Sequence, residues 1–533
     1  MKFPGGFLQV LRVLLGIGLV LSASRTPAAM VVRIGQNFTG STSGTDTFVT
    51  PADGDGAVGP NHFVELINGR YSVYDKSSGS RVQTKTDFGF WTNSGIALSV
   101  NLDVTDPRIV FDSYSQRWFA SMVDVDFNNE TSNRFLLAVS AGSDPTGAWH
   151  GFAFVADPVN GNFADFPTLG VDASGVYLGG DMFDTNNNSL GSVLVSIPKS
   201  DLLGNPPAIS GRASFGILSS NTRGNILQPA VTSGAASTAE SVLAVGDLGY
   251  DFQSHTNLVL STIQNAAAAG GATLSAATVL TVPGYSVPIN PPQPDGSSNL
   301  DNGDARLGAC VRRVDDVLYA VHAVEVSRRA VLRWYKIDAA SNTLTQSGTI
   351  TDNALDLFYP SIAANADGTV VIGCNGSSSN AFVGSYAVAG ETVNGALSFG
   401  NLMLLKAGSA SYQSPDPVTG VSRWGDYSAT SVDPSDPNRF WTLQMIPVGA
   451  SVWATQITEL ITSPLRLTIT PSGANIIISW PAGATGFQLQ YSPSLPTSGN
   501  WAPVTQTPVV ANNQSTVTLP ASESAGFFRL ANP

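Results

Sequence analysis

Charged residues are scarce in this chain. Lys, Arg, Asp and Glu together make up 12% of the 533 residues, about half of the roughly 25% that is usual in globular proteins. Long surface helices need such residues, so a polar surface made of Ser, Thr, Asn and Gly favours short strands joined by turns. The 26 basic and 39 acidic residues give a formal charge of −13, which disfavours nucleic acid and anionic membranes as partners.

Cysteine is almost absent. The only two cysteines, Cys310 and Cys374, sit in the apolar segments LGACV and VVIGC. We expect two buried free thiols, with a disulfide as the alternative because export would permit one.

Histidine is equally rare, and no pair has the spacing of zinc ligands. The sequence therefore predicts no metal site and no cofactor, apart from two stretches that resemble calcium loops. These stretches, 124–128 and 184–188, lack a Glu at the twelfth position, so calcium stays a secondary possibility. The four histidines are His62, His150, His255 and His322.

Long apolar runs are missing as well. An uncharged run of eleven residues, 13–23, follows Lys2 and Arg12 and precedes small residues that end at Ala29. A bilayer-spanning helix needs about 20 apolar residues, so this run is too short. Residues 1–29 are predicted to be a signal peptide, with an uncleaved anchor as the alternative. The expected location is secreted, extracellular or at the cell surface.

A repeat is the strongest positive signal. Each copy has a polar or aromatic residue, usually a Pro, a strand of small and aliphatic residues, a turn, and a second strand rich in aromatics. The mean spacing of roughly 62 residues suits blades of four strands. Residues 30–462 are therefore predicted to form an all-β propeller of about seven blades. The copies are 56–67, 106–123, 166–180, 228–246, 304–323, 359–374 and 426–445.

Several details of this propeller stay open. Six or eight blades are alternatives, and so is a stack of sandwiches. The copy at 228–246 is the weakest, and 265–302 is interpreted as an excursion between blades. Short β-prone pieces in 31–50 are expected to add an outer strand to the last blade, which would close the ring and remove exposed sheet edges.

The pattern changes after Ser463. Short alternating strands recur about every 10 residues and are separated by turn residues, which is typical of a β-sandwich. Residues 463–533 are predicted to form this second domain. Trp480 and Trp501 are its expected core residues.

Four segments of the chain together carry a family resemblance: AVGPNHFVELIN, DPRIVFDSYSQRWFAS, LDNGDARLGACVRR and RWGDYSATSVDPSDPNRFW. They resemble a group of secreted bacterial β-propeller proteins, over about residues 35 to 460. The tail is similar to the immunoglobulin-like or fibronectin-like modules that end many exported bacterial proteins. The resemblance implies the fold and export, and it implies no reaction.

The residues that open the repeats are the candidate ligand residues, because propellers bind ligands where the inner strands begin. A ring of acids with interspersed arginines suits a polyhydroxylated or carboxylated ligand. The alternative is structural: Asp fixes turns, and the arginines pair with the acids to hold neighbouring blades. The openers are Asp55, Asp106, Asp165, Gln228, Asp304, Tyr359 and Asp426, and the nearby arginines are Arg108, Arg306 and Arg423.

Two functions follow from these candidates. The first is a monomeric binding or scaffold protein that recognises a glycan or another surface component. The second is a sialidase-like glycoside hydrolase or a lyase, although no Glu is evident as the partner of Tyr359 or Tyr427. An enzyme needs two free carboxylates in an open cleft, roughly 5–10 Å apart, whereas a binder is expected to hold its acids in ion pairs with arginine.

Overall fold

The structure is a computed structural model, and it describes residues 30–126, 133–235, 239–482, 484, 487–493, 501–511, 514–521 and 526–531. The predicted signal peptide lies outside the described residues. The chain forms two compact units. The larger comprises Ile34–Ala389 and Asn401–Leu460, and the smaller contains Gly390–Gly400 and the chain from Ile461 onward.

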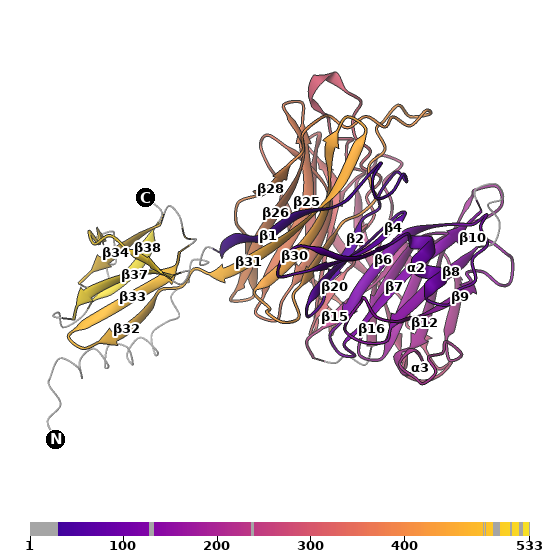
Figure 1. The fold of residues 1–533 in the computed structure, drawn as a ribbon, viewed down its shortest axis with the longest axis horizontal. Coiled ribbons are helices and arrows are strands. Elements are labelled where there is room, and N and C mark those ends of the chain that lie inside the picture. The colour runs from indigo at the N-terminus through magenta and orange to yellow at the C-terminus, as the bar shows by residue number, and fades with distance from the viewer. Residues whose placement is uncertain are drawn as a thin grey trace. The chain divides into compact units, whose positions relative to one another are not determined.

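The larger unit is built from antiparallel sheets whose strands follow one another in sequence (Figure 1). In each of the first three sheets, successive side chains of a strand point to opposite faces, so one apolar face packs against each neighbouring sheet. Their strands are β2 (Asp55–Val58), β3 (His62–Ile67), β4 (Arg70–Asp75) and β5 (Arg81–Lys85); β6 (Asp103–Asp112), β7 (Arg117–Val125), β8 (Arg134–Ser140) and β9 (Trp149–Val155); and β10 (Phe163–Val171), β11 (Gly175–Phe183), β12 (Ser189–Pro198) and β13 (Ala213–Leu218).

The remaining strands of this unit repeat the arrangement. They are β14 (Asn225–Pro229), β15 (Val231–Ser233), β16 (Ala239–Val245), β17 (His255–Gln264), β18 (Thr273–Leu274) and β19 (Thr278–Tyr285); β20 (Arg312–Val314), β21 (Val317–Val326), β22 (Arg329–Asp338) and β23 (Thr343–Ile350); β24 (Asp356–Ala364), β25 (Thr369–Ser378), β26 (Ala381–Val393), β27 (Ala396–Phe399) and β28 (Met403–Ala407); and β29 (Ala429–Val432), β30 (Arg439–Gly449) and β31 (Val452–Pro464).

The innermost strands form a closed circuit. β2 contacts β6, β6 contacts β10, and β10 pairs with β15, which pairs with β20; β20 then contacts β24, β24 contacts β29, and β29 contacts β2. A circuit of this kind surrounds a central channel, which is the arrangement of a β-propeller. The all-β propeller fold predicted from the repeat is confirmed.

The first described strand completes the ring. β1 (Met30–Thr42) is the outer strand of the last sheet, where it pairs with β31 in the order β1-β31-β30-β29. Figure 1 shows the two strands side by side. The expectation that residues 31–50 supply this strand is therefore confirmed.

The fourth repeat departs from the pattern. Its inner strand divides into β14 and β15. Strand β15 pairs in parallel with both β10 and β20, so the strands of the third and fifth repeats belong to one nine-stranded sheet. The count of seven blades stays a prediction for this reason. The interpretation of 265–302 as an excursion is wrong in its first part, because β19 pairs with β17 and is an outer strand of this unit.

Apolar side chains fill the space between neighbouring sheets. Leu66 packs with Trp118, and Phe119 on the other face of β7 packs with Leu178. Small residues allow the closest approaches: a Cβ at Gly170 would lie 2.4 Å from the Cβ of Pro229. These contacts explain the small residues of the first strands.

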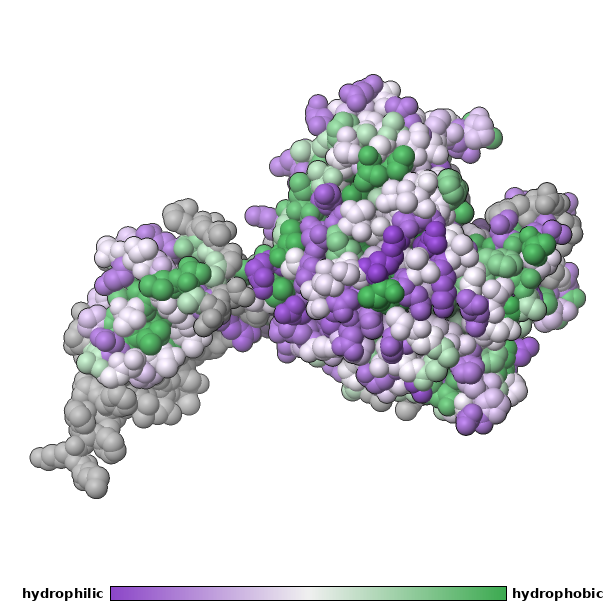
Figure 2. Space-filling model, in the orientation of Figure 1, coloured by the Kyte–Doolittle hydropathy of each residue, from purple (hydrophilic) through white to green (hydrophobic). Residues whose placement is uncertain are grey.

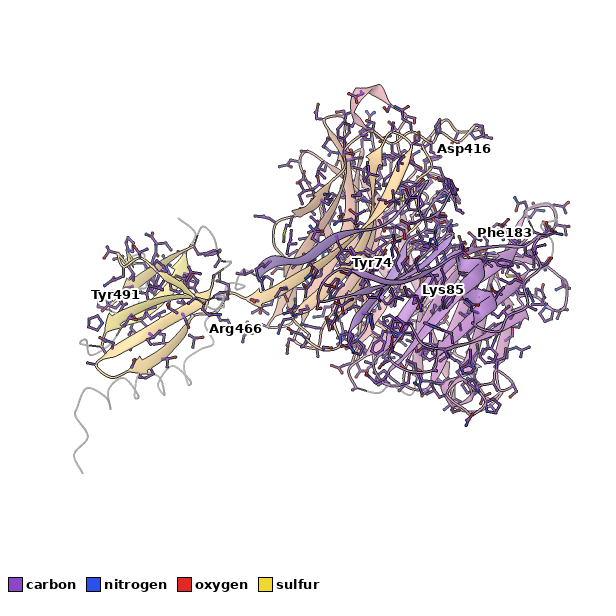
Figure 3. All side chains as sticks on the ribbon, viewed as in Figure 1. Tyr74, Lys85, Phe183, Asp416, Arg466 and Tyr491 are labelled. Carbon is purple, nitrogen blue, oxygen red and sulfur yellow. The ribbon has the colours of Figure 1, made fainter. Side chains whose placement is uncertain are left out.

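Helices are short and peripheral. They are α2 (Asp87–Asn93), α3 (Lys199–Leu202), α4 (Ser220–Arg223) and the 3₁₀ turn η1 (Pro294–Gly296). None of the helices in the described ranges has both the length and the apolar character that a membrane crossing requires. On the face of the larger unit seen in Figure 2, polar and near-neutral residues predominate and hydrophobic residues form separate small patches. Figure 3 draws the side chains, with Tyr74 marking β4 and Phe183 the end of β11.

The smaller unit contains two antiparallel sheets, with strand orders β32-β33-β37-β36 and β35-β34-β38. Its core includes Trp480, Leu489 and Val517. Trp480 is buried as expected, whereas Trp501 is half-buried and lies under the Arg529 guanidinium, 4.6 Å from the ring centroid. The strands are β32 (Thr468–Ser472), β33 (Asn475–Pro481), β34 (Gln488–Ser492), β35 (Ala502–Pro503), β36 (Val509–Ala511), β37 (Gln514–Pro520) and β38 (Phe527–Ala531).

Candidate functional site

The inner strands begin with a recurrent backbone irregularity. Asp106, Phe166, Ile226 and Tyr359 all have positive φ, at 61°, 47°, 56° and 42°, and at each the pairing with the next strand shifts register. This left-handed conformation is strained for residues with a Cβ. β-Bulges of this kind redirect side chains, and here they recur at the end of the channel where the inner strands start.

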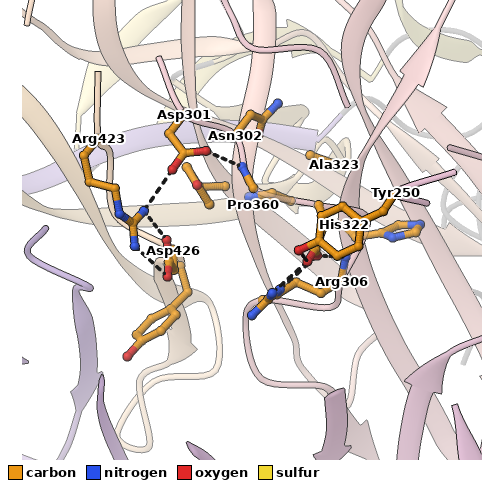
Figure 4. Close-up of a pocket in the computed structure, with 14 residues that line it drawn as sticks. Tyr250, Asp301, Asn302, Arg306, His322, Ala323, Pro360, Arg423 and Asp426 are labelled. Carbon is orange, nitrogen blue, oxygen red and sulfur yellow. Dashed lines mark hydrogen bonds and ion pairs between the residues drawn. The ribbon is translucent and has the colours of Figure 1, made fainter. Parts of the chain in front are cut away.

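A cavity of about 310 Å³ lies at this end of the channel (Figure 4). Loops from several sheets contribute to it, and most of its side chains are polar or aromatic. It is lined by Tyr250, Asp301, Asn302, Gly303, Asp304, Arg306, Gly308, His322, Ala323, Tyr359, Pro360, Arg423, Asp426 and Tyr427. We call it the start-side cavity.

Two arginines in the start-side cavity are each held by an aspartate in a bidentate pair. Arg306 donates from Nε and Nη2 to the two oxygens of Asp304, at 2.9 and 2.7 Å. Arg423 donates from Nη1 and Nη2 to the two oxygens of Asp426, at 2.6 and 3.0 Å, and also contacts Asp301 at 3.1 Å (Figure 4). Such pairs fix both partners geometrically.

The pair with Arg306 also affects the protonation of Asp304. Burial acts in the opposite direction, yet the Arg306 guanidinium holds the pKa of Asp304 below its usual value. A carboxylate that is held ionised by arginine has no proton to donate, so Asp304 is unsuited to general acid catalysis.

Three polar atoms in the start-side cavity have no partner. The hydroxyls of Tyr359 and Tyr427 and the Oδ1 of Asn302 are buried and make no hydrogen bond with any residue that the structure describes. A buried polar group without a partner costs about 1–3 kcal/mol. Among the lining residues these are the buried polar atoms without a partner, and a ligand that reached them would supply the missing hydrogen bonds.

Arg108 lies outside the cavity lining and packs against the ring of Tyr427, which does line the cavity. Arg108 donates from Nε to the Pro167 carbonyl at 2.9 Å and from Nη1 to the Gly308 carbonyl at 3.0 Å. Its guanidinium carbon lies 3.6 Å from the centroid of the Tyr427 ring, and Phe166 meets the same ring edge-on. These side chains come from different sheets, so Arg108 joins the sheets across the channel.

A group of acids also lies outside the cavity lining. Burial and the neighbouring Asp165 carboxylate hold the pKa of Asp106 well above its usual value, and the two carboxyls are within hydrogen-bonding reach of one another. Burial, followed by the Asp426 carboxylate, raises the pKa of Asp53 to about 7. Like-charged buried carboxyls retain protons because the ionised forms repel and are poorly solvated.

His322 lines the cavity but is occupied on both ring nitrogens. Nδ1 lies 2.7 Å from the Ala305 carbonyl and Nε2 lies 3.0 Å from the Tyr335 hydroxyl. Burial lowers the pKa of His322 to about 4, so the ring is neutral at pH 7. Its two hydrogen bonds give it a structural role in the cavity wall.

The loop 246–254 carries two exposed aromatic residues, of which Tyr250 lines the cavity. Tyr250 is 64% exposed and Phe252 is 79% exposed, and the Tyr250 hydroxyl donates to Asp304 at 2.7 Å. The sequence analysis missed this loop because it searched the strand openings. The signal available was the run GDLGYDFQSH, in which two aromatics interrupt a turn-forming stretch.

The structure divides the predicted ligand residues into two groups. Asp304, Arg306, Tyr359, Arg423 and Asp426 come together in the start-side cavity. Three of the other candidates do not line it: Asp106, Arg108 and Asp165.

The candidate openers Asp55 and Gln228 are also buried outside the cavity lining. Asp55 accepts a hydrogen bond from the Ile109 backbone, and Gln228 donates to the Leu307 carbonyl. These contacts give both side chains a role in joining sheets.

The two stretches that resemble calcium loops have structural contacts of their own. Asp124 pairs with Arg134 at 2.6 Å. Asp184 accepts from the backbone N–H groups of Asn186 and Asn188, which closes a turn. Cys310 and Cys374 are both buried and free, as the sequence predicts.

Comparisons with known proteins give distant matches only. No protein-family model and no curated protein matches the chain. Among solved structures, the WD40 domain of Toxoplasma gondii coronin is similar at a TM-score of 0.39 and 7% identity, covering 83% of this chain and 88% of that one. Polysaccharide lyase Uly1 is similar at 0.40 and 11%, covering 82% and 99%. The Hadza microbial sialidase Hz136 is similar at 0.34 and 10%, covering 76% and 65%. Likeness at this level does not bear on function.

Proposed function

We propose that this chain is an exported binding protein that takes a segment of a neutral glycan in the start-side cavity. The observation that carries the proposal is the set of three unpartnered polar atoms, on Asn302, Tyr359 and Tyr427. Two hydroxyls and a carbonyl oxygen match the alternating donors and acceptors of a sugar. The volume of about 310 Å³ lies at the lower end of the range for small-molecule sites.

The charges in the cavity favour a neutral ligand over an acidic one. A carboxylated or sulfated sugar needs a free cation, but Arg306 and Arg423 are both paired with aspartates. The exposed ring of Tyr250 in the cavity lining provides a flat apolar surface of the kind that stacks on a sugar face.

The same ion pairs disfavour the alternative of a glycoside hydrolase or lyase. A hydrolase needs one carboxyl that can donate a proton and a second that is free to act as base or nucleophile. Asp304 and Asp426 face the cavity, but each is bound by arginine through both oxygens. His322 has no free nitrogen to serve as a base in an elimination.

The test is a glycan array probed with the purified chain, followed by calorimetric titration of the best ligand against two variants. Tyr359→Phe and Tyr427→Phe each remove one unpartnered hydroxyl and keep the ring. Each is expected to lower affinity by about fivefold, since a neutral hydrogen bond contributes on the order of 1 kcal/mol. Their free energy of unfolding is expected to stay the same or rise, because a buried unpaired group is removed.

Tyr177→Phe is the matched control, because the Tyr177 hydroxyl is buried and donates to Asp172 at 3.0 Å away from the cavity. It is expected to cost about 1 kcal/mol of stability and to leave affinity unchanged. Unchanged affinity in the Tyr359→Phe/Tyr427→Phe double variant would contradict the proposal. Binding restricted to acidic glycans, or release of products from a polysaccharide, would contradict it as well.

A further inference from the structure

Three metal-ligating side chains converge beside the loop 246–254, which joins β16 to β17. The carboxylates of Asp247 and Asp251 and the imidazole of His255 each offer one ligand atom, and all of these atoms lie within 4.8 Å of one another. His255 Nε2 is 2.9 Å from Asp251 Oδ1 and 3.4 Å from Asp247 Oδ1. Atoms bound to one metal ion at about 2.0–2.2 Å have separations of this size.

The three groups do not satisfy one another. Both carboxylate oxygens face the same ring nitrogen of His255, and one nitrogen carries at most one proton. His255 therefore donates to at most one of the two carboxylates, and each of these oxygens is held beside the ring by a backbone N–H, from Gly249 to Asp247 at 2.8 Å and from Gln253 to Asp251 at 2.9 Å. With the imidazole neutral, the group carries a formal charge of −2, which a divalent cation balances while it bonds to all three atoms.

The surrounding structure holds the ligands in place. The Tyr285 hydroxyl accepts hydrogen bonds from the N–H groups of Gly246 and Asp247, at 3.1 and 3.2 Å, and donates to the Asn257 carbonyl at 2.9 Å. One side chain thus fixes both ends of the loop before any metal binds. Outer contacts of this type orient the ligands of metal sites and are needed for affinity.

We propose that Asp247, Asp251 and His255 bind a divalent transition-metal ion of the zinc type. Imidazole with carboxylate donors suits zinc and its neighbours better than calcium or magnesium, which prefer oxygen ligands alone. Three protein ligands leave a fourth position for water. The ion links the two ends of the loop that carries Tyr250, whose hydroxyl bonds to Asp304 in the start-side cavity.

The sequence analysis did not find this site because it searched for pairs of histidines. The spacing is Asp-x₃-Asp-x₃-His in GDLGYDFQSH, with one histidine and two carboxylates. Among the described residues, this is the group of His, Cys, Asp or Glu side chains whose ligand atoms all lie within 4.8 Å of one another.

The experiment titrates the chelator-treated, full-length chain with Zn²⁺ by calorimetry, with Ca²⁺ as a parallel arm. One equivalent of Zn²⁺ is expected to bind to the wild type, and His255→Gln is expected to weaken binding at least about tenfold. His62→Gln is the matched control, because His62 also faces an aspartate, Asp144, at 4.0 Å, and it is expected to bind zinc as the wild type does. Hydrogen exchange supplies a structural readout: Zn²⁺ is expected to slow exchange in 246–254 in the wild type and in His62→Gln only.

Three results would overturn the proposal. The first is a wild type that binds no zinc, and the second is a His255→Gln variant with a wild-type isotherm. The third is calcium binding that is as tight as zinc binding and independent of His255. None of these measurements uses a glycan, so their outcome is separate from that of the proposed function.

Discussion

The two ends of the propeller channel differ in chemistry, although the same inner strands build both. The start-side cavity is lined by paired charges, tyrosines and three unpartnered polar atoms. Where the strands end there is a hollow of about 370 Å³, the end-side hollow, with many small residues in its wall. Its charged residues are satisfied, as Arg312 donates to the Ile362 and Thr430 carbonyls and Asp433 pairs with Lys76.

The register shifts of four inner strands also lie near the starts of these strands, each at a left-handed residue. The left-handed residues Asp106, Phe166, Ile226 and Tyr359 all lie near the start of an inner strand. No polar side-chain atom in the lining of the end-side hollow is among the buried, unpartnered atoms of the described residues. Strain and unsatisfied groups persist where a function holds them, so the difference identifies the start-side cavity as the better candidate for binding.

Substitution of Arg108 is expected to have the largest effect on stability, because this side chain lies between the two ends. Arg108→Ala removes its bonds to two carbonyls and its stacking on Tyr427, and it leaves a cavity on the channel axis. The free energy of unfolding is expected to fall by about 3 kcal/mol or more in chemical denaturation. Arg108→Met, which refills much of the volume, is expected to recover part of that loss. A loss below about 1 kcal/mol for the alanine variant would show that the two ends do not depend on this side chain.

The pH dependence of stability tests the buried acids of the start side. The pKa of Asp53 rises from 3.8 to about 7 on folding, so between these values the folded state keeps a proton that the unfolded state has lost. The free energy of unfolding therefore falls as pH rises from about 4 to about 7, by at most about 4 kcal/mol from this group. Above pH 7 its contribution no longer changes.

The measurement compares denaturation of the wild type and Asp53→Asn at pH 5, 6, 7 and 8. The variant is expected to show a shallower decline, because its amide does not titrate. His322 acts in the opposite direction below pH 6.5, since burial lowers its pKa to about 4, but it is common to both proteins and cancels in the difference. Parallel curves for the two proteins would rule out a buried proton on Asp53.

The smallest expected effect sharpens the contrast between the two ends. Arg312→Gln in the end-side hollow loses two hydrogen bonds to carbonyls and is expected to cost about 1–2 kcal/mol of stability without changing glycan affinity. Arg423→Gln in the start-side cavity breaks the pair that fixes Asp426 and is expected to weaken glycan binding in the same calorimetric assay. Equal effects of the two variants on glycan affinity would contradict a functional difference between the two ends.

The sequence predicts the fold well because the repeat has a strong local signature. The predicted copies coincide with inner hairpins, as 166–180 does with β10 and β11 and 359–374 with β24 and β25. The fourth unit could not be predicted in detail, because the parallel bridges of β15 to β10 and β20 depend on contacts between distant segments. No local pattern encodes such contacts.

The site is predicted in part for a related reason. The strand openings place Asp304, Tyr359 and Asp426 in the start-side cavity, since the openings of a propeller meet at one end. Which arginine pairs with which acid depends on side-chain reach: Arg306 and Arg423 reach acids, whereas Arg108 reaches carbonyl oxygens of other sheets. Tyr250 comes from the loop that joins β16 to β17, which lies outside the repeated segments.

The pairing of β1 with β31 sets the order in which the molecule can be completed. Residues near position 40 are hydrogen-bonded to residues near 455, as Ser41 is to Thr455, so the ring stays open until almost the whole propeller sequence is available. A chain cut short before Val452 lacks β31, which is the third strand of the last sheet and the partner of β1. Ring closure therefore distinguishes full-length chains from truncated ones, whose unpaired edges are open to aggregation.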